Sequence, residues 1–443
     1  MTAEAEAPSG RERVERFLAR FSDDSEYSRN ITMLAGSTAF SQVLTLLISP
    51  ILTRLYTPAS VGAFGVFAAF VTTAASVTCG RYEVAIVSAK SRGDAARLAV
   101  IALLTSIPLI VASIFGFGAL VHFKLLGFGI VPFAAVWVAL ASVTFGSAFV
   151  ALRYWFVREQ SLGIVAGVTV AQSAVRSVAQ VVTGMLSPLA ISLVFADALG
   201  RAAALIRILP AAIPSLREAL RTSEGKLREV ALRYRDYPLI ALPSAVLNTM
   251  ALHIPVPMLA MLYGADAAGQ YTIVDRIMAV PLSIISAAIA DAFHGRAASY
   301  LREDPAALRG FFNRTVRSLL LFGIGPLALV AFLGPLTFTH LFGPRWAAVG
   351  PIAAIIAPAA LAQLTVTPVS RVVLLYKRGL RLKLLYDLVT LSIAVGVLFG
   401  CHALGWSLMH TLMWFSGAIV LRYALYYLII LSLLSSSEER LFE

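Results

Sequence analysis

Charged side chains inside long apolar segments are the residues of this chain best suited to chemistry. A charge at the centre of a bilayer costs at least ~2.5–3.5 kcal/mol, so it persists where a partner or a water-filled cavity receives it. Arginines so placed can bind an anionic ligand, and acids can pair with them or couple to a cation. The five most deeply embedded are Arg176, Asp197, Arg201, Asp275 and Arg276.

Arg176 belongs to a polar stripe that recurs in steps of three and four residues and therefore shares one helix face. A similar stripe runs through the segment 31–54. We expect a cavity between the two faces, although stripes of Ser and Thr also serve as packing surfaces, and that alternative stays open. The stripes are Thr169, Ser173, Arg176, Gln180 and Thr183, and Ser37, Ser41, Thr45 and Ser49.

The two remaining acid and base pairs differ in spacing, and therefore in whether an ion pair can form along one helix. Asp197 and Arg201 stand at i and i+4, which favours an ion pair along one helix. Asp275 and Arg276 are adjacent and point about 100° apart on a helix, so they cannot neutralise each other along one face. We therefore expect an anionic ligand to be the partner of Arg276, and Asp275 and Asp197 to act as coupling or pairing acids.

Other polar residues in or near apolar segments carry weaker signals. His253 lies close to Pro255 and Pro257, where a helix is expected to break, and a packed neutral histidine is the plainer interpretation. Near one end of their segments, Asp387 and Arg422 are expected to be paired or to reach toward the interface. Arg81 and Glu83 are expected to form a structural pair.

Enzyme signatures are absent from the sequence. It contains no GxxxxGK[ST] phosphate loop, no HExxH and no paired-cysteine metal motif. We therefore expect no catalytic residue, no metal site and no cofactor, and a transporter rather than an enzyme.

Composition identifies the elements that must position these residues. Hydrophobic residues make up 59% of the 443 residues, charged residues 14%, and the mean hydropathy is +0.82. A membrane-spanning helix needs roughly 20 apolar residues, so the chain is an all-α integral membrane protein. The twelve spans that we expect are 31–54, 59–80, 96–120, 129–151, 163–184, 187–207, 237–262, 267–291, 316–340, 347–369, 383–403 and 406–432.

Basic residues concentrate in alternate loops, which places those loops on the cytoplasmic side. The opposite loops carry only Arg54, Lys124 and Arg345. We therefore expect a multi-pass protein of the bacterial cytoplasmic (inner) membrane with both termini cytoplasmic. The formal charge of +12 then reflects orientation rather than nucleic-acid binding. The loop 208–236 alone holds Arg217, Arg221, Lys226, Arg228, Arg233 and Arg235.

An internal repeat divides the chain into halves. PILTRLYTPASVG at 50–62 aligns with PMLAMLYGADAAG at 257–269, and both copies end the first span of a half and open the second. A shift by six spans makes the repeats parallel. We expect two pseudo-symmetric six-helix lobes around a central cavity. The divisions are a cytoplasmic tail 1–30, which is either an interfacial helix or a solvated segment, an N-lobe 31–207, a cytoplasmic linker 208–236, a C-lobe 237–432 and a cytoplasmic tail 433–443.

Several stretches resemble the Wzx-type polysaccharide flippases of the multidrug/oligosaccharidyl-lipid/polysaccharide exporter superfamily. They cover residues 34 to about 370, and the last two spans match only by hydropathy. The chain lacks the two further helices of the related lipid II flippases. The matching stretches include LAGSTAFSQVLTLLISPILTRLY, GRYEVAI, LRYWFVREQ, LYGADAAGQYTIVDRIMAVPLSI and LFGPRWAAVGPIAA.

The resemblance implies translocation of a polyprenyl-diphosphate-linked oligosaccharide by alternating access, for O-antigen or exopolysaccharide biosynthesis. Implied partners are that substrate, membrane lipids, a polysaccharide polymerase and other assembly proteins. The family's cationic lumen maps by position onto Arg276, Arg176 and Arg201. Asp275 and Asp197 depart from the family pattern, which commonly has uncharged residues there.

Two other classes of function stay open. A cation-coupled small-molecule exporter on the same fold would need acidic coupling residues, and Asp197 and Asp275 would serve. A membrane enzyme or assembly scaffold would tolerate loss of the arginines. The saccharide and the coupling ion do not follow from the sequence.

Overall fold

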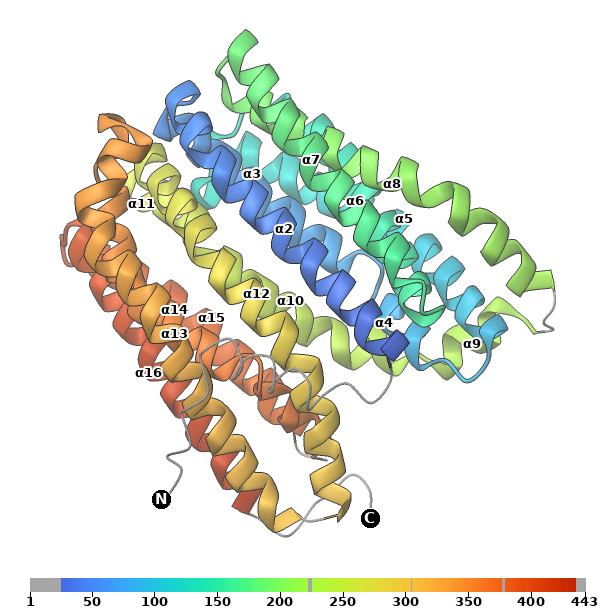
Figure 1. Ribbon diagram of the computed structural model, residues 1–443. Helices are drawn as coiled ribbons and strands as arrows, with labels where there is room; N and C mark the ends of the chain where they lie inside the picture. Colours follow the sequence, from blue (N-terminus) through green and yellow to red (C-terminus); the bar gives the residue numbers. More distant parts are fainter. Residues whose placement is uncertain (1–24, 222–224, 304, 377–378, 436–443) are drawn as a thin grey trace, which may run out of the picture.

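The computed structural model describes residues 25–435 apart from 222–224, 304 and 377–378. Within those ranges the chain is helical and contains no β-strand (Figure 1). The interfacial helix expected in the first tail lies outside the described residues, as does most of the second tail.

The first half of the chain forms long helices joined by short turns. After α7, α8 continues well beyond its predicted span, and the short α9 follows. The helices of this half are α2 (Ser25–Leu55), α3 (Pro58–Val77), α4 (Tyr82–Ser88), α5 (Arg92–His122), α6 (Ala135–Arg158), α7 (Leu162–Leu186), α8 (Ala190–Arg221) and α9 (Leu227–Arg233).

The second half repeats this pattern, with one broken helix. A π-helical turn at Tyr237–Ala241 leads into α10, and α10 and α11 meet at a bend of 44° beside His253, where the sequence predicts a break. The helices are α10 (Leu242–His253), α11 (Pro255–Tyr263), α12 (Ala265–Glu303), α13 (Pro305–Phe342), α14 (Val349–Val366), α15 (Gly379–Ala403) and α16 (Leu408–Ser435).

These helices account for the twelve predicted spans. Nine described helices are long and apolar enough to cross a membrane, and the bent pair α10 and α11 makes a tenth. The other two, α8 and α12, are 32 and 39 residues long and contain four of the five embedded charges, whereas Arg176 lies on α7. The prediction of an all-α membrane protein with about twelve spans is therefore confirmed.

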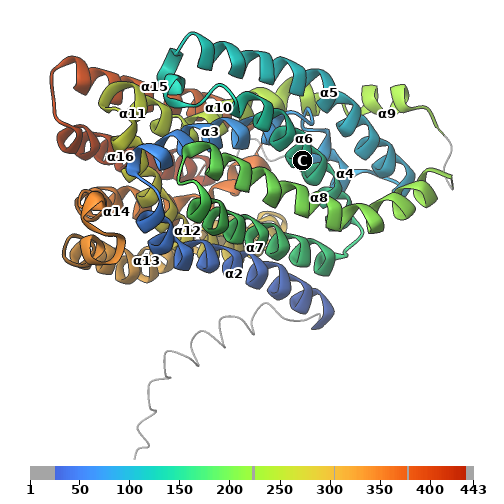
Figure 2. The same ribbon diagram turned by 90° about the horizontal axis from the view of Figure 1, so that it is seen from above.

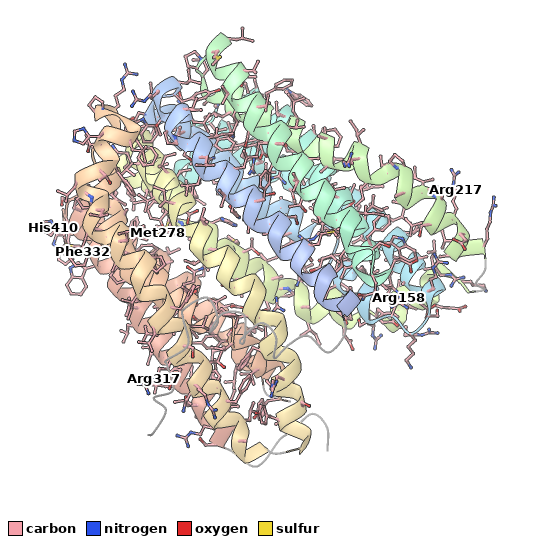
Figure 3. All side chains as sticks on the ribbon, in the orientation of Figure 1. Arg158, Arg217, Met278, Arg317, Phe332 and His410 are labelled. Carbon is pink, nitrogen blue, oxygen red and sulfur yellow. The ribbon has the colours of Figure 1, made fainter. Side chains whose placement is uncertain are left out.

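Large apolar side chains cover the outside of the bundle. Phe115 and Phe332 are each 77% exposed, which is normal where lipid tails rather than water surround a helix. Figure 3 shows Phe332 projecting from the bundle, with the labelled basic residues Arg158, Arg217 and Arg317 toward one end of the helices.

Two groups of helices diverge from a shared seam (Figures 1 and 2). α2, α7 and α8 lie in one group, α13, α14 and α16 in the other, and α12 runs between α2 and α13. The seam is formed mainly by α12 against α3 and α2. One apolar core crosses it, with Phe67 from one half and Ile273 from the other.

The repeated tyrosines have matching roles in the two halves. The Tyr56 hydroxyl donates to the carbonyl of Gln180 on α7 at 2.8 Å, and that of Tyr263 donates to the carbonyl of Trp406 at 3.1 Å. Tyr56 thus ties the first span of its half to the fifth, and Tyr263 ties the first span of its half to the turn between the last two.

The segment 208–236 differs from the predicted loop because most of it is helical. Pro210 and Pro214 do not end α8, because Ala212 and Ala219 are buried against the neighbouring helices. α9 then docks on the first half, where Arg233 pairs with Asp94 at 2.9 Å.

Candidate functional site

The polar stripes of α2 and α7 pack against each other over most of their length, and of the stripe residues only Ser37 lines an open groove. Ser41 donates to the carbonyl of Thr169 at 3.5 Å, and all four α2 residues of the stripe are buried. Their hydroxyls mostly bond to carbonyls of their own helix, as Thr45 does with Ser41 at 2.8 Å. Small side chains satisfied in this way allow close helix packing, the alternative that the sequence left open.

Asp197 on α8 is shared by two arginines. Arg201 Nε lies 2.7 Å from Asp197 Oδ2, the ion pair that the i, i+4 spacing favours. Arg176 Nη1 approaches the other oxygen, Oδ1, from α7 at 3.8 Å, and its Nη2 donates to Thr45 Oγ1 at 3.4 Å. Asp197 is 3% exposed. The carboxylate therefore holds two guanidinium groups from neighbouring helices at one level of the membrane.

Glycines make room for these arginines. Gly200 on α8 lies against the Arg176 backbone and Cβ, and a Cβ on Gly146 would lie 3.0 Å from Arg201 Nη1. Arg201 also lines a cavity of about 220 Å³ between α3, α6, α7 and α8, together with Gln172, Thr72 and Ser76. This cavity lies beside the ion cluster, because Arg201 belongs to both.

Arg276 comes to this cluster from α12, in the other half of the chain. It lies within electrostatic range of Arg176 and Asp197. Among the described residues, no carboxylate approaches its guanidinium within 4.0 Å. The side chain is partly exposed, and Met278, labelled in Figure 3, marks the level of this turn of α12. Arg276 therefore has no ion-pair partner among the described side chains.

Asp275 is exposed and makes no ion pair with a described residue. The side chains of Asp275 and Arg276 leave α12 in different directions, as their adjacency predicts. The structure therefore brings together Arg176, Asp197, Arg201 and Arg276, with Asp275 beside them. Three arginines face two acids, and one acid already bridges two of the arginines.

A second buried acid lies in the other half of the chain. Asp387 on α15 is 1% exposed, accepts a hydrogen bond from Ser244 at 2.8 Å and pairs with Lys383 at 2.8 Å. The i, i+4 spacing of Lys383 and Asp387 is a sequence signal for this pair that the sequence analysis did not use. Ser244 on α10 could not be found that way, because it is distant in sequence.

Arg422 does not reach toward the interface. It is 8% exposed, and its guanidinium carbon lies 4.4 Å from the ring centre of Tyr423 and 5.9 Å from that of Tyr386. Such cation–π contacts lower the cost of burying the charge. Asp387 and Arg422 are thus held within the second half of the chain.

The predicted pair of Arg81 and Glu83 is present, with Arg81 Nη1 3.5 Å from Glu83 Oε1. Glu83 lies beyond the end of α3 and is 1% exposed. Burial raises the pKa of its carboxyl, and the Arg81 guanidinium opposes that rise. Among the described residues, no group of three His, Cys, Asp or Glu side chains could hold a metal ion.

Comparison with known proteins gives matches by structure. No protein-family model and no curated protein sequence matches the chain. A solved inward-facing conformation of a multidrug resistance MATE family transporter of the MOP superfamily aligns with a TM-score of 0.66 and 15% identity, over 90% of this chain and 96% of that one. An outward-facing conformation of such a transporter aligns with a TM-score of 0.61 and 14% identity, over 95% and 99%.

A third similar structure is that of a MOP superfamily transporter from Pyrococcus furiosus, whose binding pocket has reverse polarity, which suggests a different function for that protein. It aligns with a TM-score of 0.56 and 12% identity, over 95% of this chain and 99% of that one. At these identities the likeness concerns the fold. This chain has the fold of the MATE transporters of the MOP superfamily.

Proposed function

We propose that this protein translocates a polyprenyl-diphosphate-linked oligosaccharide across the bacterial cytoplasmic membrane, for the biosynthesis of a cell-surface polysaccharide. The observation that carries the proposal is the convergence of Arg176, Arg201 and Arg276 from both halves of the chain, with Arg276 lacking a described carboxylate partner. A polysaccharide polymerase and other assembly proteins would act on the product.

A diphosphate suits this cluster chemically. Guanidinium groups bind phosphate oxygens through two parallel hydrogen bonds, and such bonds are strong where water is excluded. Asp197 satisfies Arg201 and holds Arg176 more loosely, since the second distance is 3.8 Å. Arg276 and Arg176 are therefore the two cations best placed to accept phosphate, while Arg201 stays on Asp197.

Alternating access is supported by the contacts between the two halves. Trp346 donates from its indole nitrogen to the carbonyl of Thr53 at 2.8 Å, and Arg54 donates to the carbonyl of His340 at 3.4 Å. These contacts join the halves at the end that the basic loops predict to be outer. The solved inward-facing and outward-facing relatives in fold show that this architecture accommodates both conformations.

The test is translocation of a fluorescent polyprenyl-diphosphate saccharide in reconstituted vesicles. We expect Arg276→Ala to abolish translocation with normal expression, and Arg276→Lys to restore it partly, because a point charge cannot make the forked contact. Arg217→Ala, an exposed arginine at the far end of α8, is the matched control. Normal translocation by a well-folded Arg276→Ala protein would refute the substrate assignment.

The orientation is part of the same proposal. A cysteine at Arg228, exposed on α9, should react only with cytoplasmic reagents, and one at Asp266, exposed on α12, only with external reagents. Both native cysteines are buried and should give little background. Labelling of both sites from the same side of the membrane would contradict the predicted orientation.

A cation-coupled small-molecule exporter is the second candidate. The exposed carboxylate of Asp275, with no described ion-pair partner, favours it, because such an acid can exchange a cation for a substrate. An exporter should move a cationic dye against its gradient, driven by H⁺ or Na⁺, and lose this activity in Asp275→Asn. Dye export with no translocation of the lipid-linked saccharide would decide for the exporter.

A further inference from the structure

An apolar groove on the first half of the chain is separate from the cluster of arginines. It has a volume of about 550 Å³, within the range of small-molecule sites, and is lined by residues of α2, α7 and α8. Met33 and Ser37 form one wall, Gly163, Gly167 and Val170 the floor, and Arg207 the other wall.

The floor is open because α7 has glycine at two successive turns. In most membrane proteins a GxxxG pattern lets two helices pack closely. Here a Cβ on Gly167 would meet only Arg207, at 3.9 Å, and one on Gly163 only Met33, at 3.4 Å. Neither glycine is thus required by helix packing within the chain, although glycine weakens a helix.

Arg207 supplies the charge of the groove. Its guanidinium lies against Gly167, it is exposed, and no carboxylate among the described residues comes within 4.0 Å of it. It follows Ala190, the first residue of α8, by seventeen residues. That distance is about 26 Å of helix, close to the ~30 Å thickness of the hydrocarbon core. Arg207 therefore stands at the level of lipid headgroups.

We propose that this groove is a binding site for one anionic membrane phospholipid, with an acyl chain over Gly163 and Gly167 and the phosphate on Arg207. The lining is apolar where a chain would lie, and its one cation stands where a phosphate would lie. A second copy of this chain fits less well, because packing through Gly163 and Gly167 would bring two Arg207 side chains together in a medium of low dielectric.

The test titrates phosphatidylglycerol, and separately phosphatidylcholine, into the delipidated full-length protein, with bound lipids counted by native mass spectrometry. We expect one phosphatidylglycerol to bind well before the others and more tightly than phosphatidylcholine. Arg207→Gln should weaken that first event by roughly tenfold or more, as loss of a charge-assisted hydrogen bond does. Gly167→Leu should weaken it similarly by filling the groove without removing the positive charge of Arg207.

Arg217→Gln is the control, because Arg217 is exposed on the same helix but does not line the groove. It should leave the first binding event unchanged. Equal binding by Arg207→Gln and Arg217→Gln, or full affinity in Gly167→Leu, would overturn the proposal. A dimer that Gly167→Leu dissociates would also overturn it, by assigning the face to a second copy.

Discussion

Gly62 on α3 and Gly269 on α12 face each other across the seam, and they are equivalent positions of the internal repeat. A Cβ on Gly62 would overlap with the carbonyl oxygen of Ala265, and a Cβ on Gly269 with that of Pro58. Pro58 and Ala265 are also equivalent positions. The helices thus meet through a reciprocal backbone contact, which is what a two-fold pseudo-symmetry axis between the glycines requires.

Gly62→Ala and Gly269→Ala should each force α3 and α12 apart. The clash is with backbone, which cannot rotate away, so overpacking should cost about 1–3 kcal/mol. We expect a lower midpoint of thermal unfolding in detergent for both variants. Gly116→Ala is the control, because a Cβ there meets nothing within 4 Å. If all three variants unfold alike, the seam does not depend on the glycine contact.

Asp197→Asn should destabilise the protein, because it leaves two arginines without their shared carboxylate. Breaking a buried ion pair from one side costs ~3–5 kcal/mol, and the partial exposure of Arg176 should place this case at the lower end. Thermal unfolding of Asp197→Asn and of Asp197→Asn with Arg201→Gln checks this. The second substitution should recover part of the loss; a double variant less stable than the single one would contradict the assignment of Asp197 as a pairing acid.

Much of this arrangement was accessible from sequence because membrane helices follow simple rules. The spans follow from apolar length, and the Asp197–Arg201 pair follows from helical spacing. The polar stripes of α2 and α7 suggested a cavity, whereas most of the α2 stripe is buried against α7, the alternative that the sequence left open. Two Ser/Thr faces can line a water-filled cavity or pack directly against each other, depending on the distance between the helices. The local sequence pattern does not determine that distance.

Contacts between distant segments were also beyond the sequence. Nothing in the spacing of Ser244 and Asp387 joins α10 to α15, and nothing joins Arg176 to Asp197 before α7 and α8 are packed. α8 continues through Pro210 and Pro214, because tertiary burial outweighs local helix propensity. The GIVAG run at 163–167 looks like ordinary apolar sequence. Only the structure shows that no other helix packs closely on its glycines.

Glu83 should make stability depend on pH. Its pKa in the folded protein is raised by burial above the ordinary value of 4.5, so the unfolded chain releases this proton first as pH rises. The contribution of Glu83 to stability is therefore greatest below pH 4.5 and declines as pH rises toward the folded pKa. The midpoint temperature of thermal unfolding, measured from pH 4 upward, should fall less steeply with pH in Glu83→Gln than in the parent protein. If the two plots of midpoint against pH are parallel, Glu83 has no part in the pH dependence.

Trp346→Phe should loosen the contact between the two halves at the predicted outer end. Trp346 is fully buried, and phenylalanine retains an aromatic ring there while losing the hydrogen bond to the Thr53 carbonyl. Such a bond contributes about 1 kcal/mol, enough to change the ratio of closed to open forms about fivefold.

Spin labels on cysteines at the exposed positions Thr57 and Arg345 should report a larger population of long distances by pulsed electron paramagnetic resonance. Trp414→Phe, at a tryptophan that is 61% exposed, should leave the distances unchanged. If Trp346→Phe also leaves them unchanged, the indole bond does not hold this end closed, and the apolar packing around Trp346 must do so.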